Sequence, residues 1–169
     1  ENAPADAMGI RARWDQMGWK DKKLWVIGGD GAMLDIGFQS LSRMLASGMN
    51  IKVLVLDTQV YSNTGGQSST ATLMGQNTKF TVHGKEIPGK VERRKEIAQI
   101  CMMHPNTFVA QTSCAMTNHF YKSIMAANEY DGPAVVSVYT TCQPEHGVGD
   151  NMAMQQSKLA VDTRTFPVL

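Results

Sequence analysis

The sequence predicts an α/β fold in which helices cover both faces of a doubly wound parallel sheet. Two observations carry this prediction. Short continuous apolar runs, typical of strands buried on both faces, alternate with longer segments of helical periodicity. The loops after the first two runs are rich in Gly, Ser, Thr and Asn. Because ligands of open α/β sheets bind where the strands end, we expect the functional site at the carboxyl edge of the sheet.

Length and composition indicate one ordinary globular domain. The chain has 169 residues, of which 43% are hydrophobic and 18% charged, and its formal net charge is +1. This balance offers no basic excess for nucleic acid or an anionic membrane, and no apolar run approaches the ~20 residues of a membrane span. We therefore expect neither nucleic acid nor a membrane as a partner. We expect a cytoplasmic location. Since the sequence begins without Met, we expect residues 1–169 to be one domain of a larger multidomain enzyme.

The first part of the chain predicts a strand-helix-strand unit. An irregular amphipathic pattern predicts a helix over residues 5–19, and the apolar run 24–27 predicts a buried strand that enters a Gly-rich turn. Helical periodicity returns over 35–47, and a Gly follows it as a stop. The run 51–56 predicts the second strand, so that the unit forms a parallel pair joined by a right-handed crossover.

The second part predicts two more strands and three helices. It begins with a long Gly-, Ser- and Thr-rich loop over 58–89, and a compact domain rarely keeps such a loop without a use for it. The pattern then predicts, in order, a helix over 90–103, a strand over 107–111, a helix over 117–130, a strand over 134–139 and a helix over 152–161.

Each predicted helix should present an apolar face to the sheet. The residues expected on these faces are Ile36, Leu41, Met44 and Leu45, then Val91, Ile97, Ile100 and Cys101, then Phe120, Ile124, Met125 and Ala127. The charged run Arg93 to Lys95 is expected on the solvated back of its helix, with binding of an acidic partner as the alternative.

The turn after the first strand carries a carboxylate where a phosphate would bind. Three glycines in the segment 28–31 let the backbone approach a ligand, and N–H groups near a helix start suit a phosphate. The spacing matches neither the dinucleotide fingerprint nor the P-loop. Asp30 would repel a phosphate unless a cation lay between them, so the turn predicts a metal. Mg²⁺ would find further oxygen ligands at the end of the next strand, in Thr58, nearby carbonyls and Asn63.

This pattern resembles thiamine-diphosphate enzymes, which carry Gly-Asp-Gly followed at similar distance by an Asn or its substitute, here Thr58. The run Asp57 to Ser69 reads Asp-Thr-Gln-Val-Tyr-Ser-Asn-Thr-Gly-Gly-Gln-Ser-Ser. It is similar to the carboxy-terminal thiamine domain of pyruvate:ferredoxin (flavodoxin) oxidoreductases, and the likeness extends from about Leu24 to the end of the chain. The family usually has an aromatic residue where this chain has Ala32, which leaves substrate choice open.

By position, the resemblance implies a thiamine-diphosphate site with Mg²⁺. Asp30, the Thr58 hydroxyl and the Val60 carbonyl would hold the ion. Asn63 would lie near the thiazolium, where the substrate adds, and is the expected catalytic residue. The residues expected to bind the cofactor are Gly29, Asp30, Gly31, Ala32, Thr58, Gln59, Val60, Tyr61, Ser62 and Asn63. The glutamate that activates the cofactor has no candidate here, and the resemblance assigns it to a separate pyrimidine-binding domain.

The three cysteines form no recognisable metal site on their own. Cys101 and Cys114 fall in apolar patterns, so we expect small buried side chains. Cys142 lies in a polar loop, where the resemblance implies that it is one ligand of a [4Fe–4S] cluster whose other cysteines lie outside this sequence. A free thiol is the alternative, since one chain with a single loop Cys cannot show a four-Cys site. A zinc site with His146 would have too few ligands.

The resemblance implies oxidative decarboxylation of a 2-oxoacid, with pyruvate as the first candidate, to acyl-CoA and CO₂. The implied partners are the 2-oxoacid and coenzyme A, ferredoxin or flavodoxin reached through iron–sulfur clusters, the remaining domains or subunits of the enzyme, and a second copy in a homodimer. Two alternatives stay open: a non-oxidative thiamine-diphosphate decarboxylase or synthase, and a non-catalytic binding domain of the same fold.

Overall fold

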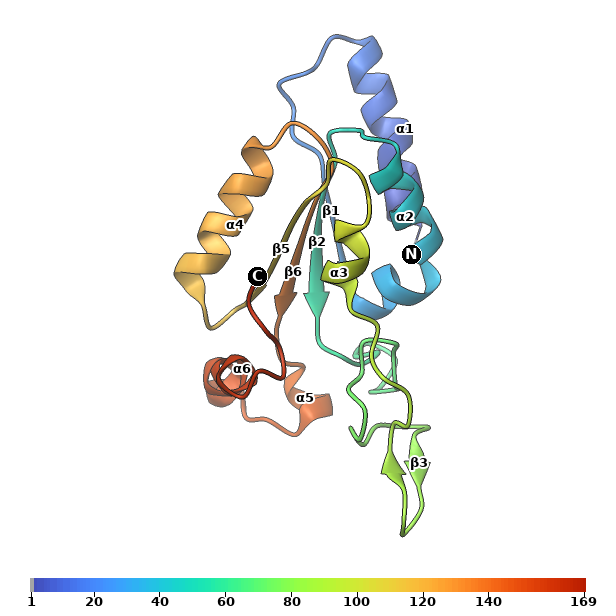
Figure 1. Cartoon of the computed structure of the whole chain (residues 1–169), viewed down its shortest axis with the longest axis vertical. Helices are drawn as coiled ribbons and strands as arrows, with labels where there is room; N and C mark the ends of the chain where they lie inside the picture. Colours follow the sequence, from blue (N-terminus) through green and yellow to red (C-terminus); the bar gives the residue numbers. More distant parts are fainter. Residues whose placement is uncertain (1) are drawn as a thin grey trace.

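The computed structural model describes residues 2–169 and contains a four-stranded parallel sheet in the order β1-β2-β6-β5. The strands are β1 (Trp25–Gly29), β2 (Lys52–Asp57), β5 (Phe108–Ser113) and β6 (Ala134–Tyr139). Helix α4 lies on one side of the sheet and helices α1, α2 and α3 lie on the other (Figure 1). The predicted doubly wound α/β fold is confirmed.

Six α-helices and a small hairpin complete the described part of the chain. The helices are α1 (Ala3–Gln16), α2 (Phe38–Ala46), α3 (Ile97–Met102), α4 (Thr117–Glu129), α5 (Gln143–His146) and α6 (Ala153–Asp162). A π-helical segment, η1 (Gly31–Ile36), joins β1 to α2, and a 3₁₀ turn, η2 (Asp150–Met152), precedes α6. The antiparallel strands β3 (Val82–His83) and β4 (Pro88–Gly89) project from the body (Figure 1). Over residues 2–169, the helices are all too short or too polar to cross a membrane.

The sheet separates two apolar cores because successive side chains of a strand point to opposite faces. In β2, Val53 and Val55 belong to the core that contains Leu41 of α2 and Ile97 of α3, whereas Leu54 packs against the core under α4. Parallel crossovers are right-handed, and those through α2 and α4 advance in opposite directions across the sheet, so their helices fall on opposite faces.

The third helix is shorter than predicted, because the segment 90–96 is bound to the long loop and is not helical. The Lys90 ammonium donates to the carbonyls of Ser69 (2.9 Å) and Thr72 (3.0 Å). The Lys95 N–H donates to a carbonyl of the same loop (2.7 Å). These tertiary contacts take the place of the helical bonds that the periodicity favoured, so the charged run does not lie on a helix at all.

Three predicted core positions are wrong, since Ile36, Val91 and Met125 are 57%, 53% and 40% exposed. Ile36 ends the π-helical segment, whose period differs from that of an α-helix, Val91 lies in the non-helical segment, and Met125 lies on the solvent side of α4. The predicted positions that are buried are Leu41, Met44, Leu45, Ile97, Cys101 and Ala127, with Ile100, Phe120 and Ile124 half-buried. Cys114 is only half-buried, with its thiol 3.1 Å from Ser157 Oγ.

Candidate functional site

The carboxyl ends of β1 and β2 bring the two predicted halves of the site together. Asp30 directly follows β1 and Thr58 directly follows β2, and the parallel pairing of the two strands continues to Gly29 and Leu56. The Thr58 N–H and hydroxyl donate to Asp30 Oδ1, at 3.2 Å and 3.1 Å. Residues far apart in the chain meet here because neighbouring parallel strands end at the same edge of the sheet.

Oxygen atoms surround the Thr58 hydroxyl. Its Oγ1 lies 3.1 Å from Asp30 Oδ1, 3.0 Å from the Val60 carbonyl oxygen and 2.9 Å from Ser62 Oγ. A hydroxyl carries one proton, so it cannot donate to all of these neighbours at once. Carboxylate, hydroxyl and carbonyl oxygens are the ligands that Mg²⁺ takes in proteins. The donor set therefore fits an Mg²⁺ ion held by Asp30, Thr58 and Val60.

Asp30 is a buried carboxyl group with only neutral donors around it. It is 1% exposed, and none of the ion pairs formed within residues 2–169 involves it. Its Oδ2 accepts a hydrogen bond from Ser69 Oγ (2.5 Å). Burial raises the pKa of Asp30, and the hydrogen bonds from Ser69 and Thr58 oppose that rise. A bound cation would compensate the charge that these neutral donors compensate only in part.

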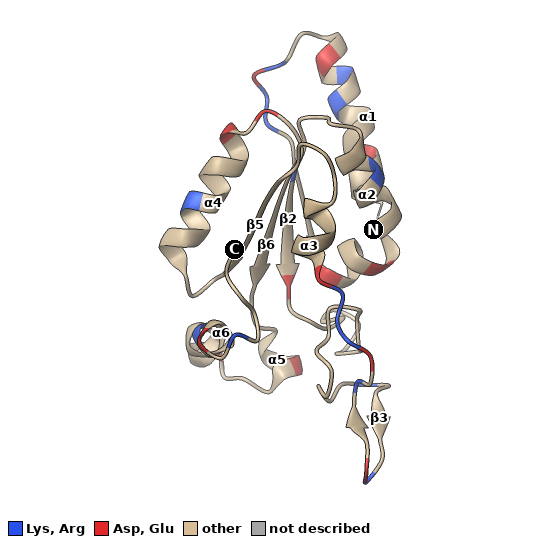
Figure 2. Ribbon diagram, in the orientation of Figure 1, with Lys and Arg blue, Asp and Glu red and all other residues tan. Residues whose placement is uncertain are grey.

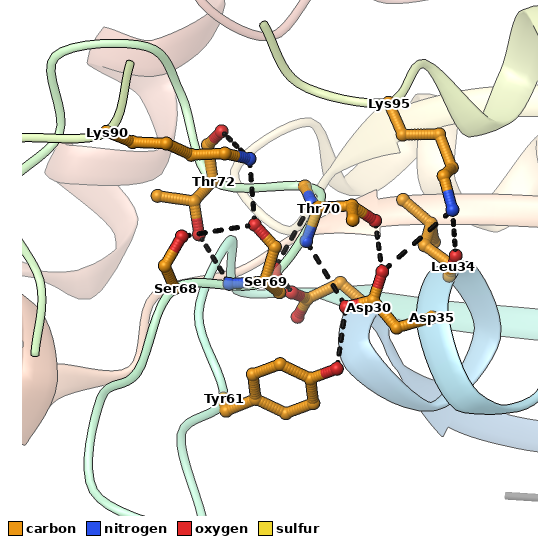
Figure 3. A network of polar contacts seen from close by, with 11 residues as sticks. Asp30, Leu34, Asp35, Tyr61, Ser68, Ser69, Thr70, Thr72, Lys90 and Lys95 are labelled. Atoms are coloured by element: carbon orange, nitrogen blue, oxygen red, sulfur yellow. Dashed lines mark hydrogen bonds and ion pairs between the residues drawn. The ribbon is translucent and has the colours of Figure 1, made fainter. Parts of the chain in front are cut away.

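A polar network holds the long loop against the segment that follows Asp30 (Figure 3). Asp35 of η1 accepts hydrogen bonds from the Tyr61 hydroxyl (2.7 Å), the Thr70 N–H (3.2 Å) and the Thr70 hydroxyl. The Lys95 ammonium lies 3.9 Å from Asp35 Oδ1 and also donates to the Leu34 carbonyl. The long loop, which was expected to be functional, is therefore anchored on the segment that begins at Asp30, a candidate metal ligand.

Gly31 permits the close approach of Tyr61 to this turn. A Cβ atom at Gly31 would overlap the carbons of the Tyr61 ring, so no larger residue fits without displacing the ring. Together with the Tyr61–Asp35 hydrogen bond, this contact fixes the aromatic ring over the start of η1.

A cavity of about 310 Å³ lies at this edge of the sheet. Its lining residues are Gly29, Asp30, Gly31, Ala32, Leu56, Thr58, Val60, Tyr61, Ser62, Asn63 and Thr64. They include every residue predicted to bind the cofactor except Gln59, which takes a φ of 61° and whose side chain lines a separate cavity of about 470 Å³. Asn63, the predicted catalytic residue, is exposed at this cavity.

Sequence reasoning missed two buried groups at this edge. Ser69 donates a hydrogen bond to Asp30. No local sequence pattern shows that the long loop folds back to bring Ser69 to this position. Asp57 is 3% exposed and accepts a hydrogen bond from the Gln59 N–H (3.1 Å). Burial and the nearby Asp30 raise the pKa of Asp57 to about 8, and Arg94 opposes the shift. An acidic residue that directly ends a buried apolar run was the available signal for Asp57.

Cys142 lies at the same edge of the sheet. It follows β6, whose last residue pairs with Asp57, and its N–H donates to His146 Nδ1 (3.3 Å). Burial lowers the pKa of His146, while a hydrogen bond to the Thr58 backbone and the charge of Glu145 oppose that shift. Within residues 2–169, no group of three or more His, Cys, Asp and Glu could hold a metal ion. The Mg²⁺ ligands proposed above are not such a group, because they comprise one carboxylate, one hydroxyl and one backbone carbonyl.

Comparison with known proteins gives the following matches. Residues 1–138 match the family model described as thiamine pyrophosphate enzyme, C-terminal TPP binding domain. The chain is 38% identical to a pyruvate-flavodoxin oxidoreductase of Rhodospirillum rubrum, over 88% of the chain and 12% of that protein. It is 35% identical to the pyruvate synthase subunit PorB of Thermotoga maritima, over 99% of the chain and 54% of that subunit. The chain thus spans only part of the length of these relatives.

Among solved structures, the fold is similar to the 2-oxoglutarate:ferredoxin oxidoreductase from Magnetococcus marinus, solved with 2-oxoglutarate, coenzyme A and succinyl-CoA bound. The TM-score is 0.69 with 23% sequence identity, over 84% of this chain and 45% of that chain. At this sequence identity the similarity supports the fold alone, and the chemistry of the site has to be argued from its residues.

Proposed function

The chain belongs to the C-terminal TPP-binding domains of thiamine pyrophosphate enzymes, and from that premise we propose that it holds the diphosphate of thiamine diphosphate through Mg²⁺ inside a 2-oxoacid oxidoreductase. The observation that carries this proposal is the set of oxygens around the Thr58 hydroxyl, with Asp30 Oδ1 at 3.1 Å and the Val60 carbonyl at 3.0 Å. These oxygens belong to residues that line one cavity with the rest of the predicted site.

The protein's part in the reaction is to bind and orient. Thiamine diphosphate, when bound, supplies a nucleophilic carbon and an electron sink for decarboxylation of a 2-oxoacid. Asp30, Thr58 and Val60 would hold the Mg²⁺ ion that neutralises the diphosphate, and the backbone over 29–32 would line the diphosphate. The exposed Asn63 amide can donate a hydrogen bond to negative charge on the substrate.

For the whole enzyme we propose oxidative decarboxylation of a 2-oxoacid, with pyruvate as first candidate, to acyl-CoA and CO₂, with electrons passing to ferredoxin or flavodoxin. The names and identities of the relatives support this class of reaction. Cys142 would contribute one ligand to a [4Fe–4S] cluster, completed by cysteines from other domains or subunits. Its position at the carboxyl edge supports this role, since Cys142 follows β6 and the last residue of β6 pairs with Asp57, next to Thr58. A second copy of the enzyme would complete a homodimer.

Reduction of a viologen dye by the complete enzyme tests the reaction class. With pyruvate, coenzyme A and oxidised dye, we expect acetyl-CoA, CO₂ and two reduced dye molecules per turnover, and slower turnover with 2-oxoglutarate. Release of CO₂ without dye reduction or a need for coenzyme A would instead identify a non-oxidative decarboxylase. Absence of both turnover and cofactor binding would identify a non-catalytic domain.

A further inference from the structure

The segment before α3 and the segment after α6 contribute to a third cavity, of about 540 Å³. Three of its lining residues are arginines, Arg93, Arg94 and Arg164, and Glu96 is the single acidic one. The formal charges of these four side chains leave an excess of two positive charges. This cavity shares no lining residue with the cavity at Asp30. We call the cavity formed around Arg93, Arg94 and Arg164 the arginine cleft.

Arg94 is the buried member of the arginine cleft. Its side chain is 8% exposed, and its Nε and Nη2 donate to the Glu96 carboxylate at 2.6 Å and 2.7 Å. The guanidinium carbon lies 5.2 Å from the centre of the Phe166 ring. Its Nη1 is buried and has no hydrogen-bond partner within the described residues. A buried cationic donor without an acceptor is destabilising, and Arg94 is a lining residue of the cleft that keeps one guanidinium nitrogen unsatisfied.

Arg93 and Arg164 are the exposed members. Neither takes part in an ion pair among residues 2–169, so both guanidinium groups remain available to a ligand. Arg164 is held in a turn with φ 60°, where its N–H donates to the Val161 carbonyl (2.9 Å). The segment that leads into α3 is a stretch of the ribbon where Lys and Arg gather (Figure 2). Arg93 and Arg94 therefore line a cavity, and do not lie on the solvent-exposed face of a helix as the sequence predicted.

We propose that the arginine cleft binds the phosphate group of a phosphomonoester, a ligand other than the one held at Asp30. The guanidinium fork matches phosphate oxygens in geometry, and the two excess positive charges match a phosphate dianion. The volume is that of a small-molecule site and exceeds what a lone ion needs. Leu73 and Met74, which is 62% exposed, also line the cleft and offer apolar surface to the organic part of the ligand.

Isothermal titration of the complete protein tests this proposal, with inorganic phosphate and adenosine 5′-monophosphate as probes. Low salt preserves the electrostatic attraction, and EDTA keeps Mg²⁺ away from Asp30. We expect saturable binding at one site per chain, at least tenfold weaker in Arg93→Gln and in Arg164→Gln. Both side chains are exposed, so both variants should fold, which circular dichroism checks. Lys122→Gln, at an exposed basic residue of α4, is the matched control and should bind as the wild type does.

The two probes separate the possible sources of the phosphate group. Tighter binding of the nucleotide supports an organic phosphomonoester, whereas equal or tighter binding of inorganic phosphate overturns that choice of ligand. Absence of saturable binding, or equal weakening by Lys122→Gln, overturns the site itself. An Asp30→Asn variant should keep the wild-type affinity for both probes, so that the cleft and the diphosphate site fail or succeed separately.

Discussion

Asp30 and Asp57 place two buried carboxyl groups at the ends of neighbouring strands. Burial raises the pKa of each, and Asp30 adds to the rise at Asp57 through charge repulsion. The protein therefore keeps an acidic pair where it would be unfavourable without a cation. Mg²⁺ bound together with a diphosphate, as we propose, would resolve this conflict, because the ion would neutralise both the Asp30 carboxylate and the phosphate oxygens.

The pH dependence of stability should reveal Asp57 in the metal-free protein. The folded-state pKa is about 8 against an ordinary value of 3.8, so the folded state holds the proton more tightly than the unfolded chain. The resulting stabilisation is fully present below about pH 4 and is lost as the pH rises through about 8. Urea unfolding in EDTA should show a smaller free energy of unfolding at pH 8 than at pH 5.

Asp57→Asn isolates this contribution. Asn keeps an acceptor for the Gln59 N–H but cannot ionise, so the decline between pH 5 and pH 8 should become shallower. Asp162→Asn, at an exposed position, should keep the wild-type slope. An Asp57→Asn variant with an unchanged slope would contradict the assignment.

Ser69 should act on the metal through Asp30. Its hydroxyl donates to Asp30 Oδ2 (2.5 Å) and so orients the carboxylate. Ser69→Ala should weaken Mg²⁺-dependent binding of thiamine diphosphate about 10-fold, in the range usual for groups that orient a metal ligand. The neighbouring Ser68→Ala removes only a 3.4 Å contact to the Ser69 carbonyl and should bind nearly as the wild type does. Equal titration curves for wild type and Ser69→Ala would count against this role.

Among the elements, the turn after β1 and the long loop form one packed unit. Gly31→Ala should destabilise the protein by roughly 1–3 kcal/mol, since the added Cβ must displace the Tyr61 ring. Gly9→Ala is the matched control, because its position in α1 is open and exposed, and it should stabilise by roughly 0.5–1 kcal/mol. Thermal unfolding measures both changes. A neutral Gly31→Ala would show that the ring is not packed on the turn.

The strands and long helices could be predicted from sequence because their apolar periodicity is strong and local. The run predicted over 134–139 is β6 to the residue. The segment 90–96 could not be predicted, because Lys90 bonds to carbonyls about twenty positions earlier and this overrides helical propensity. The contact of Ser69 with Asp30 could not be predicted for the same reason. Asp30 and Thr58 could be predicted as site residues, since each directly follows a strand that the sequence pattern reveals.

On the scale of the whole molecule, we propose that the chain supplies one side of a composite site. The exposed Asn63 and the half-buried Cys142 lie at the edge where other parts of the enzyme would have to meet it. The relatives fit this view, since the chain spans 12% of the length of one and 54% of another. No reading of this sequence could identify residues that the rest of the enzyme contributes.

Iron content of the complete enzyme tests the role of Cys142. Cys142→Ser should lose one cluster, about four iron atoms per chain, and with it dye reduction. Binding of thiamine diphosphate with Mg²⁺ should persist, because Cys142 does not line that cavity. Cys114→Ser is the control and should keep its iron, since that thiol is hydrogen-bonded to Ser157 Oγ. Full iron content in Cys142→Ser would show that Cys142 is not a ligand of the cluster.

The central claim is that Asp30 and Thr58 bind Mg²⁺ and, through it, the diphosphate. Isothermal titration of thiamine diphosphate into the complete enzyme, with and without Mg²⁺, tests it most directly. We predict Mg²⁺-dependent binding that Asp30→Asn weakens about 100-fold, or about 3 kcal/mol, with a smaller loss in Thr58→Val and none in Asp162→Asn. Equal affinity of wild type and Asp30→Asn, or binding indifferent to Mg²⁺, would contradict the account.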